Sequence, residues 1–342
     1  MPASAQAPPA KTAEDQFKNI QAFKGMPADQ IFPAMQFMAA SLGVECDFCH
    51  VPGKFDADDK RAKKTARQMI AMTLSINKDS FNGHKEVTCY SCHRGNTDPV
   101  GTPPVITTDA EPEHGKEEAA APGAPVKADE LIDKYIAALG GADAIHKISS
   151  RVSKGTISFS GHESPIELFA KAPDKRMSVT HSSTGDSITA FDGHIGWLGN
   201  TGRPAREMSG QEAEAARLDA DFYLATHLKE IFSGFRVGRP DKIGEHAVAQ
   251  LIGMRQGQPP VRLYFDRDSG LLMRQIRYTD TPVGRLPTQI DYADYRELDG
   301  VKVPFRWTLS RVNGRFTIQL AEAKQNVPID DQKFAKPAAP AK

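Results

Sequence analysis

The sequence predicts two domains: a mostly α-helical domain over residues 16–98, and an α+β domain built on an antiparallel sheet over residues 127–336. Three observations predict this division. All four cysteines lie between positions 46 and 92, among stretches with helical signals. Residues 99–126 are rich in Pro, Ala, Glu and Gly and lack apolar periodicity, which is typical of a linker. Beyond them, short β-branched and aromatic segments alternate with turn signals, which is typical of antiparallel strands.

The composition narrows the class of protein. A chain of 342 residues is long for one domain, and its 43 basic residues balance its 43 acidic residues, so nothing indicates a nucleic-acid binder. No apolar run is long enough to cross a bilayer. The start, "MPASAQAPPAKTAEDQ", is small, Pro-rich and polar, like a chain from which a signal peptide has been removed. We therefore expect a periplasmic or otherwise extracytoplasmic protein, with disordered ends over residues 1–15 and 337–342.

The second domain begins with a predicted helix in "KADELIDKYIAALGG", which Gly140 and Gly141 end. A further helical segment is predicted over residues 210–234. The strands are expected in "GTISFSG", "PIELFAKAPD", "SITAFDGHIGWLGN", "PVRLYFDRDSG", "LLMRQIRYTD" and "GRFTIQLAEA". In the last of these, Phe316, Ile318 and Leu320 alternate with polar residues, as burial of one strand face requires.

The helical domain contains an internal repeat. Cys46, Cys49 and His50 form a Cys-x-x-Cys-His motif, and the same motif recurs in "TCYSCHRG" as Cys89, Cys92 and His93. Each copy follows a Met-x-x-Met pair on a helical stretch. The pairs are Met35 with Met38 and Met69 with Met72.

Four kinds of site use such a motif: a zinc site, a redox dithiol, a disulfide and a covalently attached haem. Two knuckles could share one zinc ion, but the 39 residues between Cys49 and Cys89 exceed the usual spacing, and a four-thiolate site has no use for the two histidines. A thioredoxin-like dithiol needs one motif after a strand. A disulfide framework would spread its cysteines along the chain. Haem attachment uses every element, because two thiols bind the porphyrin and the adjacent histidine binds the iron.

The axial ligands opposite the histidines are less defined by the sequence. A Met thioether is the usual partner of His in electron-transfer haems, whereas a Met pair at helical spacing is otherwise core filler. The recurrence of one pair per motif favours ligation, but spacing does not choose between the two members of each pair. His84 lies near the second motif and is interpreted as a loop residue that could compete as a ligand. The basic run Lys60, Arg61, Lys63 and Lys64 is interpreted as a solvated helix face, with docking of an acidic partner as the alternative.

Residues 30–95 resemble the cytochrome c subunit of photosynthetic reaction centres and, more closely, its non-photosynthetic dihaem relatives. "MQFMAASLGVECDFCH" and "ARQMIAMTLSIN" followed by "VTCYSCHRG" carry the resemblance. It implies two covalently bound haem c groups, with the first Met of each pair as the distal ligand. Met35 would then serve the haem of His50, and Met69 that of His93. The reaction-centre subunit has four haems, so service to a reaction centre is not implied.

The second domain is similar to the LolA-like lipoprotein-sorting fold, a curved antiparallel sheet closed by helices. "AALGGADAIHKISS", "AFDGHIGW", "LYFDRDSGLLMRQ" and "DYRELDGVKVPF" carry this resemblance, which implies an apolar ligand in a half-barrel. We assign no catalytic role to its polar residues. Asp266, Asp294 and Asp299 are interpreted as turn-forming carboxylates, and the histidines are scattered at 194, 227 and 246.

The main hypothesis is a dihaem electron-transfer protein, not an enzyme, which exchanges electrons with redox protein partners through two His/Met-ligated haems. Its second domain would bind a partner, the envelope or an apolar ligand. One alternative is a dihaem peroxidase-like enzyme with one open haem. The other is a lipid or lipoprotein carrier on which the haems are accessory or sensor groups.

Overall fold

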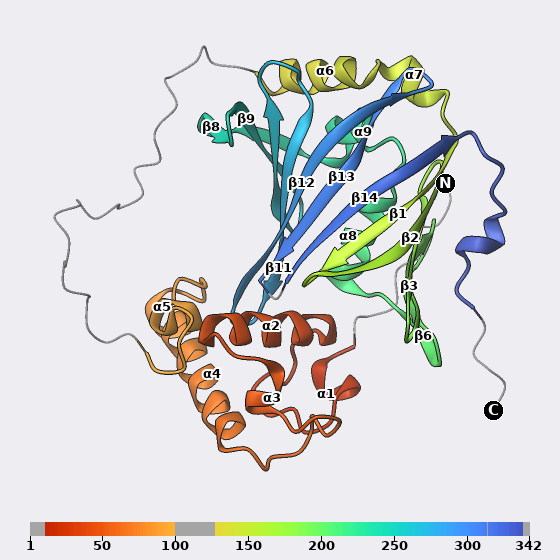
Figure 1. Cartoon of the computed structure of the whole chain (residues 1–342). Coiled ribbons are helices and arrows are strands. Elements are labelled where there is room, and N and C mark those ends of the chain that lie inside the picture. The colour runs from red at the N-terminus through yellow and green to blue at the C-terminus, as the bar shows by residue number, and fades with distance from the viewer. Residues whose placement is uncertain (1–10, 100–126, 313, 338–342) are drawn as a thin grey trace, which may run out of the picture. The chain divides into compact units, whose positions relative to one another are not determined.

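The computed structural model describes residues 11–99, 127–312 and 314–337, and the chain divides into two compact units (Figure 1). The first unit comprises Met1–Glu111 together with Thr279–Leu286, and the second comprises Pro112–Tyr278 and Pro287–Lys342. Residues 279–286 were expected in the second domain, because they lie within a run of predicted strands, but they belong to the first unit. The expected linker lies, apart from residue 99, outside the described residues.

The N-terminal part of the first unit is helical, and residues 279–286 add the ends of two strands and the turn between them. Its helices are α1 (Ala13–Gln16), the 3-10 helix η1 (Ala28–Gln30), α2 (Ile31–Leu42), α3 (Cys46–Cys49), α4 (Arg61–Ser80) and α5 (Cys89–His93). Residues 11–15 were expected to be disordered but are ordered here. Ala13 is fully buried, and its N–H donates to the carbonyl of Met26 at 2.8 Å. Burial of this short helix therefore overrides the polar composition of the segment. The rest of the expected disordered start, residues 1–10, lies outside the described residues.

The two long helices of this unit carry the methionine pairs. Helix α2 ends at Gly43, whose φ of 67° is the left-handed conformation that glycine adopts readily. Helix α4 buries Lys63, Ile70, Thr73 and Asn77, whose spacing of seven, three and four residues keeps them on related faces of the helix. Ile70 packs with residues of α2 in the core of the unit.

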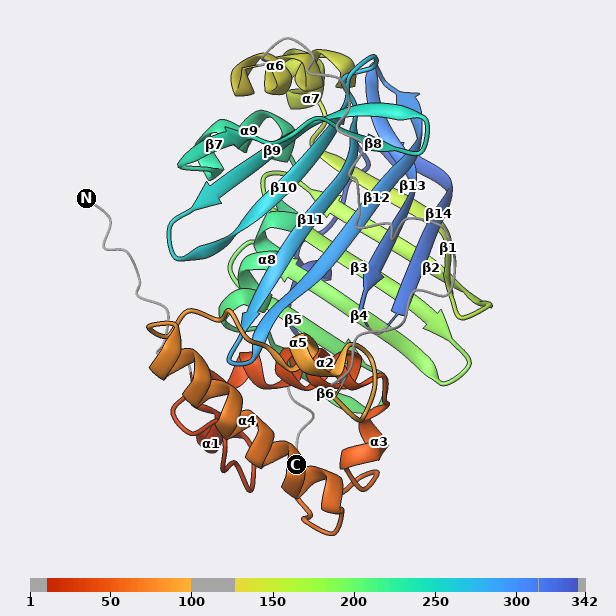
Figure 2. The same cartoon turned by 90° about the vertical axis from the view of Figure 1, so that its left-hand side faces the viewer.

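The second unit is built on one fourteen-stranded antiparallel sheet, which is curved and does not close on itself (Figures 1 and 2). The strand order is β6-β5-β4-β3-β2-β1-β14-β13-β12-β11-β10-β9-β7, with β8 paired to β9. The first six strands are β1 (Ser150–Phe159), β2 (His162–Lys171), β3 (Lys175–Ser182), β4 (Gly185–Asp192), β5 (Gly196–Asn200) and β6 (Arg203–Glu207). The others are β7 (Gly234–Val237), β8 (Asp241–Ile243), β9 (His246–Arg255), β10 (Gln258–Asp266), β11 (Leu272–Thr281), β12 (Gly284–Leu298), β13 (Val301–Arg311) and β14 (Gly314–Gln325).

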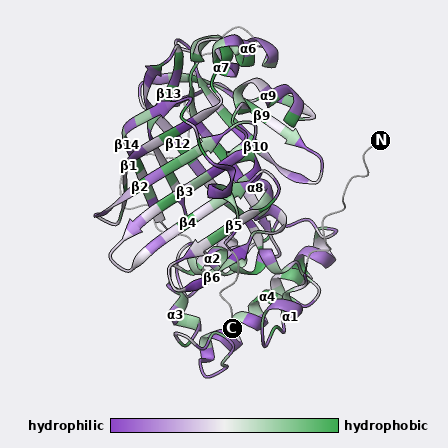
Figure 3. Cartoon of the chain, turned by 90° about the vertical axis from the view of Figure 1, so that its right-hand side faces the viewer, coloured by the Kyte–Doolittle hydropathy of each residue, from purple (hydrophilic) through white to green (hydrophobic). Residues whose placement is uncertain are grey.

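The predicted strand segments all contribute strands of this sheet. In β14, Ile318 and Leu320 are buried at 7% and 4% exposure, which confirms the alternation seen in the sequence. Figure 3 shows hydrophobic and hydrophilic residues alternating along several strands. A curved antiparallel sheet is therefore confirmed for the second unit.

Helices cover parts of the sheet. Helix α6 (Ala128–Leu139) lies where the sequence predicted it and ends at Gly140, and α7 (Ala142–His146) follows. The helical segment predicted over 210–234 is two helices, α8 (Gly210–Ala220) and α9 (Leu224–Ile231). They are separated because Asp221 leaves the helical conformation and its carboxylate accepts the N–H of Tyr223 at 2.9 Å.

In the described part of the chain, no helix is long and apolar enough to cross a membrane.

Candidate functional site

Each cysteine pair occupies a single helical turn. Cys46 and Cys49 are the first and last residues of α3, and Cys89 and Cys92 lie at the same spacing in α5. A separation of three residues places both sulfur atoms on one side of a helix, so each turn presents two thiols to one ligand. All four thiols are free, and burial raises the pKa of Cys49 and Cys89. Burial thus favours the thiol form of Cys49 and Cys89 over the thiolate.

The two histidines share one hydrogen-bonding arrangement. The Nδ1 atom of His50 lies 3.0 Å from the carbonyl oxygen of Phe55, and that of His93 lies 3.0 Å from the carbonyl oxygen of Asn96. A carbonyl only accepts, so each bond requires a proton on Nδ1 and leaves a lone pair on Nε2 of the neutral ring. Within the described residues, no hydrogen-bond partner contacts either Nε2. Both rings are thus fixed in the tautomer that a metal ligand needs.

The two methionine pairs differ in their surroundings. Met35 and Met38 are partly buried and pack against the core of the first unit. Met69 and Met72 are 36% and 45% exposed on α4. The second pair therefore contributes little to the core, which weakens the interpretation of these residues as core filler.

Apolar side chains are unusually exposed around the motifs. Of the thirteen large hydrophobic side chains that are exposed in the described part of the chain, eight lie between Phe17 and Tyr90. They include Phe48 inside the first motif at 43% exposure and Tyr90 inside the second at 56%. An exposed aromatic ring within each motif is what a large apolar group bound at that motif would cover. Together with the paired thiols and the adjacent histidine, these residues fit a porphyrin.

The two repeats are interlocked. Helix α2 of the first repeat packs against α5 of the second, and α3 packs against α4. The N–H of Gly95, just after His93, donates to the carbonyl of Ser41 at 2.9 Å. Within the second repeat, the side chain of Asn77 on α4 also bonds both backbone groups of Val87, at 2.7 and 2.9 Å, just before the second motif. Each attachment turn is therefore positioned partly by the other repeat.

The interpretation of the basic run as a solvated face is wrong for one of its members. Lys63 is only 9% exposed, and its ammonium donates to the carbonyls of Phe55 and Ala57 at 2.9 and 2.8 Å. The sequence contained a signal for this burial, because Lys63 lies seven residues before Ile70 and therefore on the same face of the helix as that buried residue. Lys60 donates to the carbonyl of Asp47 inside the first motif, whereas Lys64 is exposed. His84 is exposed in the loop between α4 and α5.

The polar residues of the second unit have structural roles. Asp266 is 5% exposed and accepts the N–H and hydroxyl of Ser269 at 2.6 and 2.7 Å, as its turn context predicted. His246 donates to the other oxygen of this carboxylate at 3.0 Å, and His227 pairs with Asp221.

Asp299 lies in the turn between β12 and β13, as expected, with a φ of 46°. Asp294 was also expected in a turn, but it lies inside β12, where its φ of 53° interrupts the pairing with β13, so the turn interpretation is wrong for this residue. No cluster of three or more His, Cys, Asp or Glu side chains that could hold a metal ion occurs within the described ranges.

Comparison with known proteins agrees with the geometry of the first unit. Residues 1–128 match the family model of the photosynthetic reaction centre cytochrome C subunit. The reaction centre cytochrome c subunit of Thermochromatium tepidum is 31% identical over 91 residues, which cover 25% of this chain and 22% of that protein. Cytochrome c-554 of Chloroflexus aurantiacus is 32% identical over 82 residues, covering 22% of this chain and 20% of the relative. The chain therefore spans about a fifth of the length of these relatives, and the similarity supports a c-type cytochrome in the N-terminal part.

Solved structures similar to the C-terminal part include a LolA superfamily protein from Nitrosomonas europaea. It is 14% identical, with a TM-score of 0.43, and the match covers 62% of this chain and 99% of that one. A DUF1329 family protein from Desulfovibrio piger is 11% identical with a TM-score of 0.43, covering 60% of this chain and 96% of that one.

Proposed function

We propose that this chain is an extracytoplasmic dihaem c-type cytochrome that carries single electrons between redox protein partners. The observation that carries the proposal is the equivalence of its two sites. Both combine two thiols on one helical turn with a histidine whose Nδ1 is bonded to a carbonyl, at 3.0 Å in each case. This arrangement suits covalent attachment through sulfur and ligation through Nε2.

The roles of the residues follow from this geometry. The Cys46 and Cys49 thiols would add across the two vinyl groups of one haem, and Cys89 and Cys92 would do the same for the second. His50 and His93 would bind the irons on the proximal side. A haem with both axial positions filled supplies a one-electron centre with no vacant position for substrate. The protein's part is to fix the rings, exclude water from them and hold the two sites at a constant separation.

The proposed distal ligands are Met35 for the haem of His50 and Met69 for that of His93. The resemblance to the reaction-centre subunit supports the first member of each pair. The exposures of Met69 and Met72, at 36% and 45%, leave both side chains available and do not choose between them. Met38 and Met72, one turn further along each helix, are the alternatives.

The second unit would bind a redox partner, an envelope component or an apolar ligand. Its curved open sheet offers an extended surface for docking. No specific observation favours the peroxidase-like enzyme or the lipid carrier over electron transfer, so the cytochrome remains the single proposal.

Expression of the full chain with a cytochrome c maturation system tests the proposal. Intact mass should show two added haems, and the Cys46→Ala/Cys49→Ala and Cys89→Ala/Cys92→Ala variants should each retain one. Both haems should titrate reversibly with one-electron stoichiometry, and the ferric protein should be low-spin. Absence of haem would refute the proposal, and a high-spin ferric haem that turns over peroxide would favour the enzyme.

A further inference from the structure

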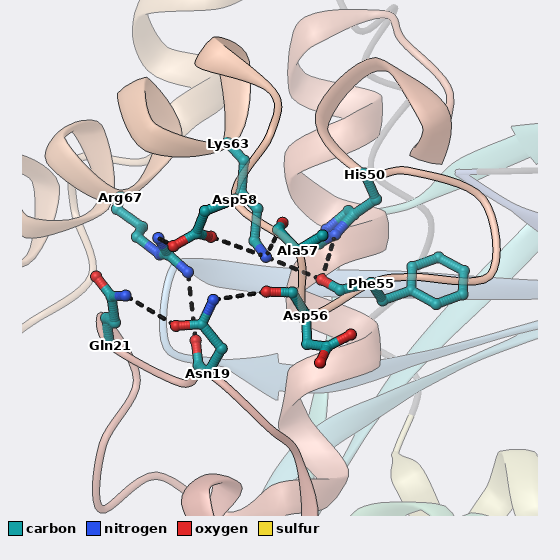
Figure 4. Close-up of polar contacts among 9 residues, drawn as sticks. All are labelled: Asn19, Gln21, His50, Phe55, Asp56, Ala57, Asp58, Lys63 and Arg67. Carbon is teal, nitrogen blue, oxygen red and sulfur yellow. Dashed lines mark hydrogen bonds and ion pairs between the residues drawn. The ribbon is translucent and has the colours of Figure 1, made fainter.

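One carbonyl oxygen in the first site serves two donors. The carbonyl of Phe55 accepts the Nδ1–H of His50 at 3.0 Å and the ammonium of Lys63 at 2.9 Å (Figure 4). The acceptor that orients the candidate haem ligand is therefore shared with a cation.

Lys63 is fixed in this position. Besides Phe55, its ammonium donates to the carbonyl of Ala57 at 2.8 Å and pairs with Oδ1 of Asp58 at 3.2 Å. Two of the three N–H donors of the ammonium group are thus used in hydrogen bonds to carbonyls, and the ion pair with Asp58 adds a third contact. The side chain is 11% exposed, which limits screening of its charge by solvent.

A second layer of contacts holds the loop against Lys63. Arg67 donates to Oδ2 of Asp58 at 2.9 Å and to the carbonyl of Asn19 at 3.3 Å. The amide of Asn19 donates to the carbonyl of Asp56 at 2.6 Å. Three consecutive carbonyls, those of residues 55–57, thus accept side-chain hydrogen bonds (Figure 4). The residues of this network carry two positive charges, on Lys63 and Arg67, and two negative charges, on Asp56 and Asp58.

The second site lacks this arrangement. The carbonyl of Asn96 accepts the Nδ1–H of His93 at 3.0 Å, and no ammonium or guanidinium among the described residues bonds to it. The two histidines therefore have bonds of the same length but acceptors in different electrostatic surroundings.

We propose that Lys63 is a positioning residue that gives the haem of His50 a higher reduction potential than the haem of His93. This inference rests on the proposed function. A hydrogen bond from Nδ1 to a strong acceptor makes the ring a better electron donor to the metal. By engaging the same oxygen, the ammonium weakens that acceptor, and the positive charge beside the site also favours the reduced state. Both effects raise the potential of the first haem and direct electrons from the second site toward it.

Redox titration of the haem-loaded full chain tests this inference. Lys63→Met should lower the potential of the His50 haem and change the equilibrium constant for electron exchange between the haems about tenfold, equivalent to about 59 mV for one electron. The matched control is Lys64→Met, which removes the exposed lysine next along the same helix. Lys64→Met should shift either potential by less than a third of the shift caused by Lys63→Met. The Cys89→Ala/Cys92→Ala variant keeps only the first site and therefore identifies which of the two measured potentials belongs to the His50 haem.

Equal shifts in the two lysine variants, or a shift confined to the His93 haem, would overturn the role of Lys63 while leaving the dihaem cytochrome intact. Failure to attach haem would instead refute the proposed function, and this inference with it. If Lys63→Met does not fold, Lys63→Gln provides the test, because its amide still donates to a carbonyl but carries no charge. It should lower the same potential, and an unchanged potential would count against the inference.

Discussion

Gly43 and Gly95 are in contact through their backbones. This contact joins the end of α2, which carries Met35 and Met38, to the segment that follows α5. A Cβ atom on Gly43 would lie 2.2 Å from the carbonyl oxygen of Gly95. Gly43 also has a φ of 67°, which side chains disfavour. Two requirements, close approach and left-handed backbone, therefore coincide at one residue.

Gly43→Ala should lower the free energy of unfolding by about 3 kcal/mol, since backbone strain and a clash with an inflexible carbonyl add together. Gly53→Ala is the control: Gly53 has a φ of 77°, but no atom lies within 4 Å of its added Cβ. It should cost only about 1 kcal/mol, the strain alone. Urea unfolding followed by helical circular dichroism measures both. Equal costs would show that the Gly43–Gly95 contact is unimportant in solution.

The methionine variants should separate ligation from packing. We expect Met35→Ala and Met69→Ala each to remove the near-infrared Met–iron band of one haem, whereas Met38→Ala and Met72→Ala preserve both bands. Met35 packs against the core, so its loss should also destabilise the protein by about 2 kcal/mol, and loss of the 36% exposed Met69 should cost less than about 1 kcal/mol. Intact bands in Met35→Ala and Met69→Ala would transfer the assignment to the second members of the pairs.

Asp266 should make the stability of the second unit depend on acid. Burial raises the pKa of this carboxyl, but hydrogen bonds from Ser269 and His246 lower it more, leaving it below the usual 3.8. Its contribution is therefore present above pH 3.8 and is lost as the pH falls through the folded-state pKa. Urea midpoints of wild type and Asp266→Asn should differ most at neutral pH and converge on acidification. Asp268→Asn, at an exposed neighbour, should show no such convergence.

The C-terminal segment should stabilise the sheet through Phe334. This residue of η2 (Asp331–Phe334) is fully buried, and its carbonyl accepts the indole N–H of Trp197 at 2.8 Å. Phe334→Ala should cost about 4 kcal/mol, because a large cavity would remain beside Trp197. Phe159→Ala, at a ring that is 42% exposed, should cost about 1 kcal/mol. Thermal unfolding followed by tryptophan fluorescence distinguishes the two, and similar costs would contradict the docking of this segment.

The periodic features of the fold were predictable from the sequence, and the breaks in periodicity were not. Alternation at Ile318 and Leu320 predicted a strand with one buried face, and the apolar face at Leu131 and Ile132 predicted α6. The break between α8 and α9 was missed, because it depends on one local hydrogen bond to Asp221 inside a stretch that is helical by composition. Helix α1 was missed because four residues carry no periodic signal.

Residue type and spacing are enough to identify the thiols, histidines and methionines of the candidate site, because both are properties of the covalent chain. The difference between the two sites appears only in the folded chain. From the sequence, Lys63 resembles the other lysines of an exposed helix face. In the folded chain, α4 lies beside the loop of residues 55–57, and the ammonium of Lys63 donates to the Phe55 carbonyl that also bonds to His50. Every residue carries the same backbone carbonyl, so the sequence does not indicate which carbonyl a side chain will contact. Such contacts are therefore known only from the folded structure.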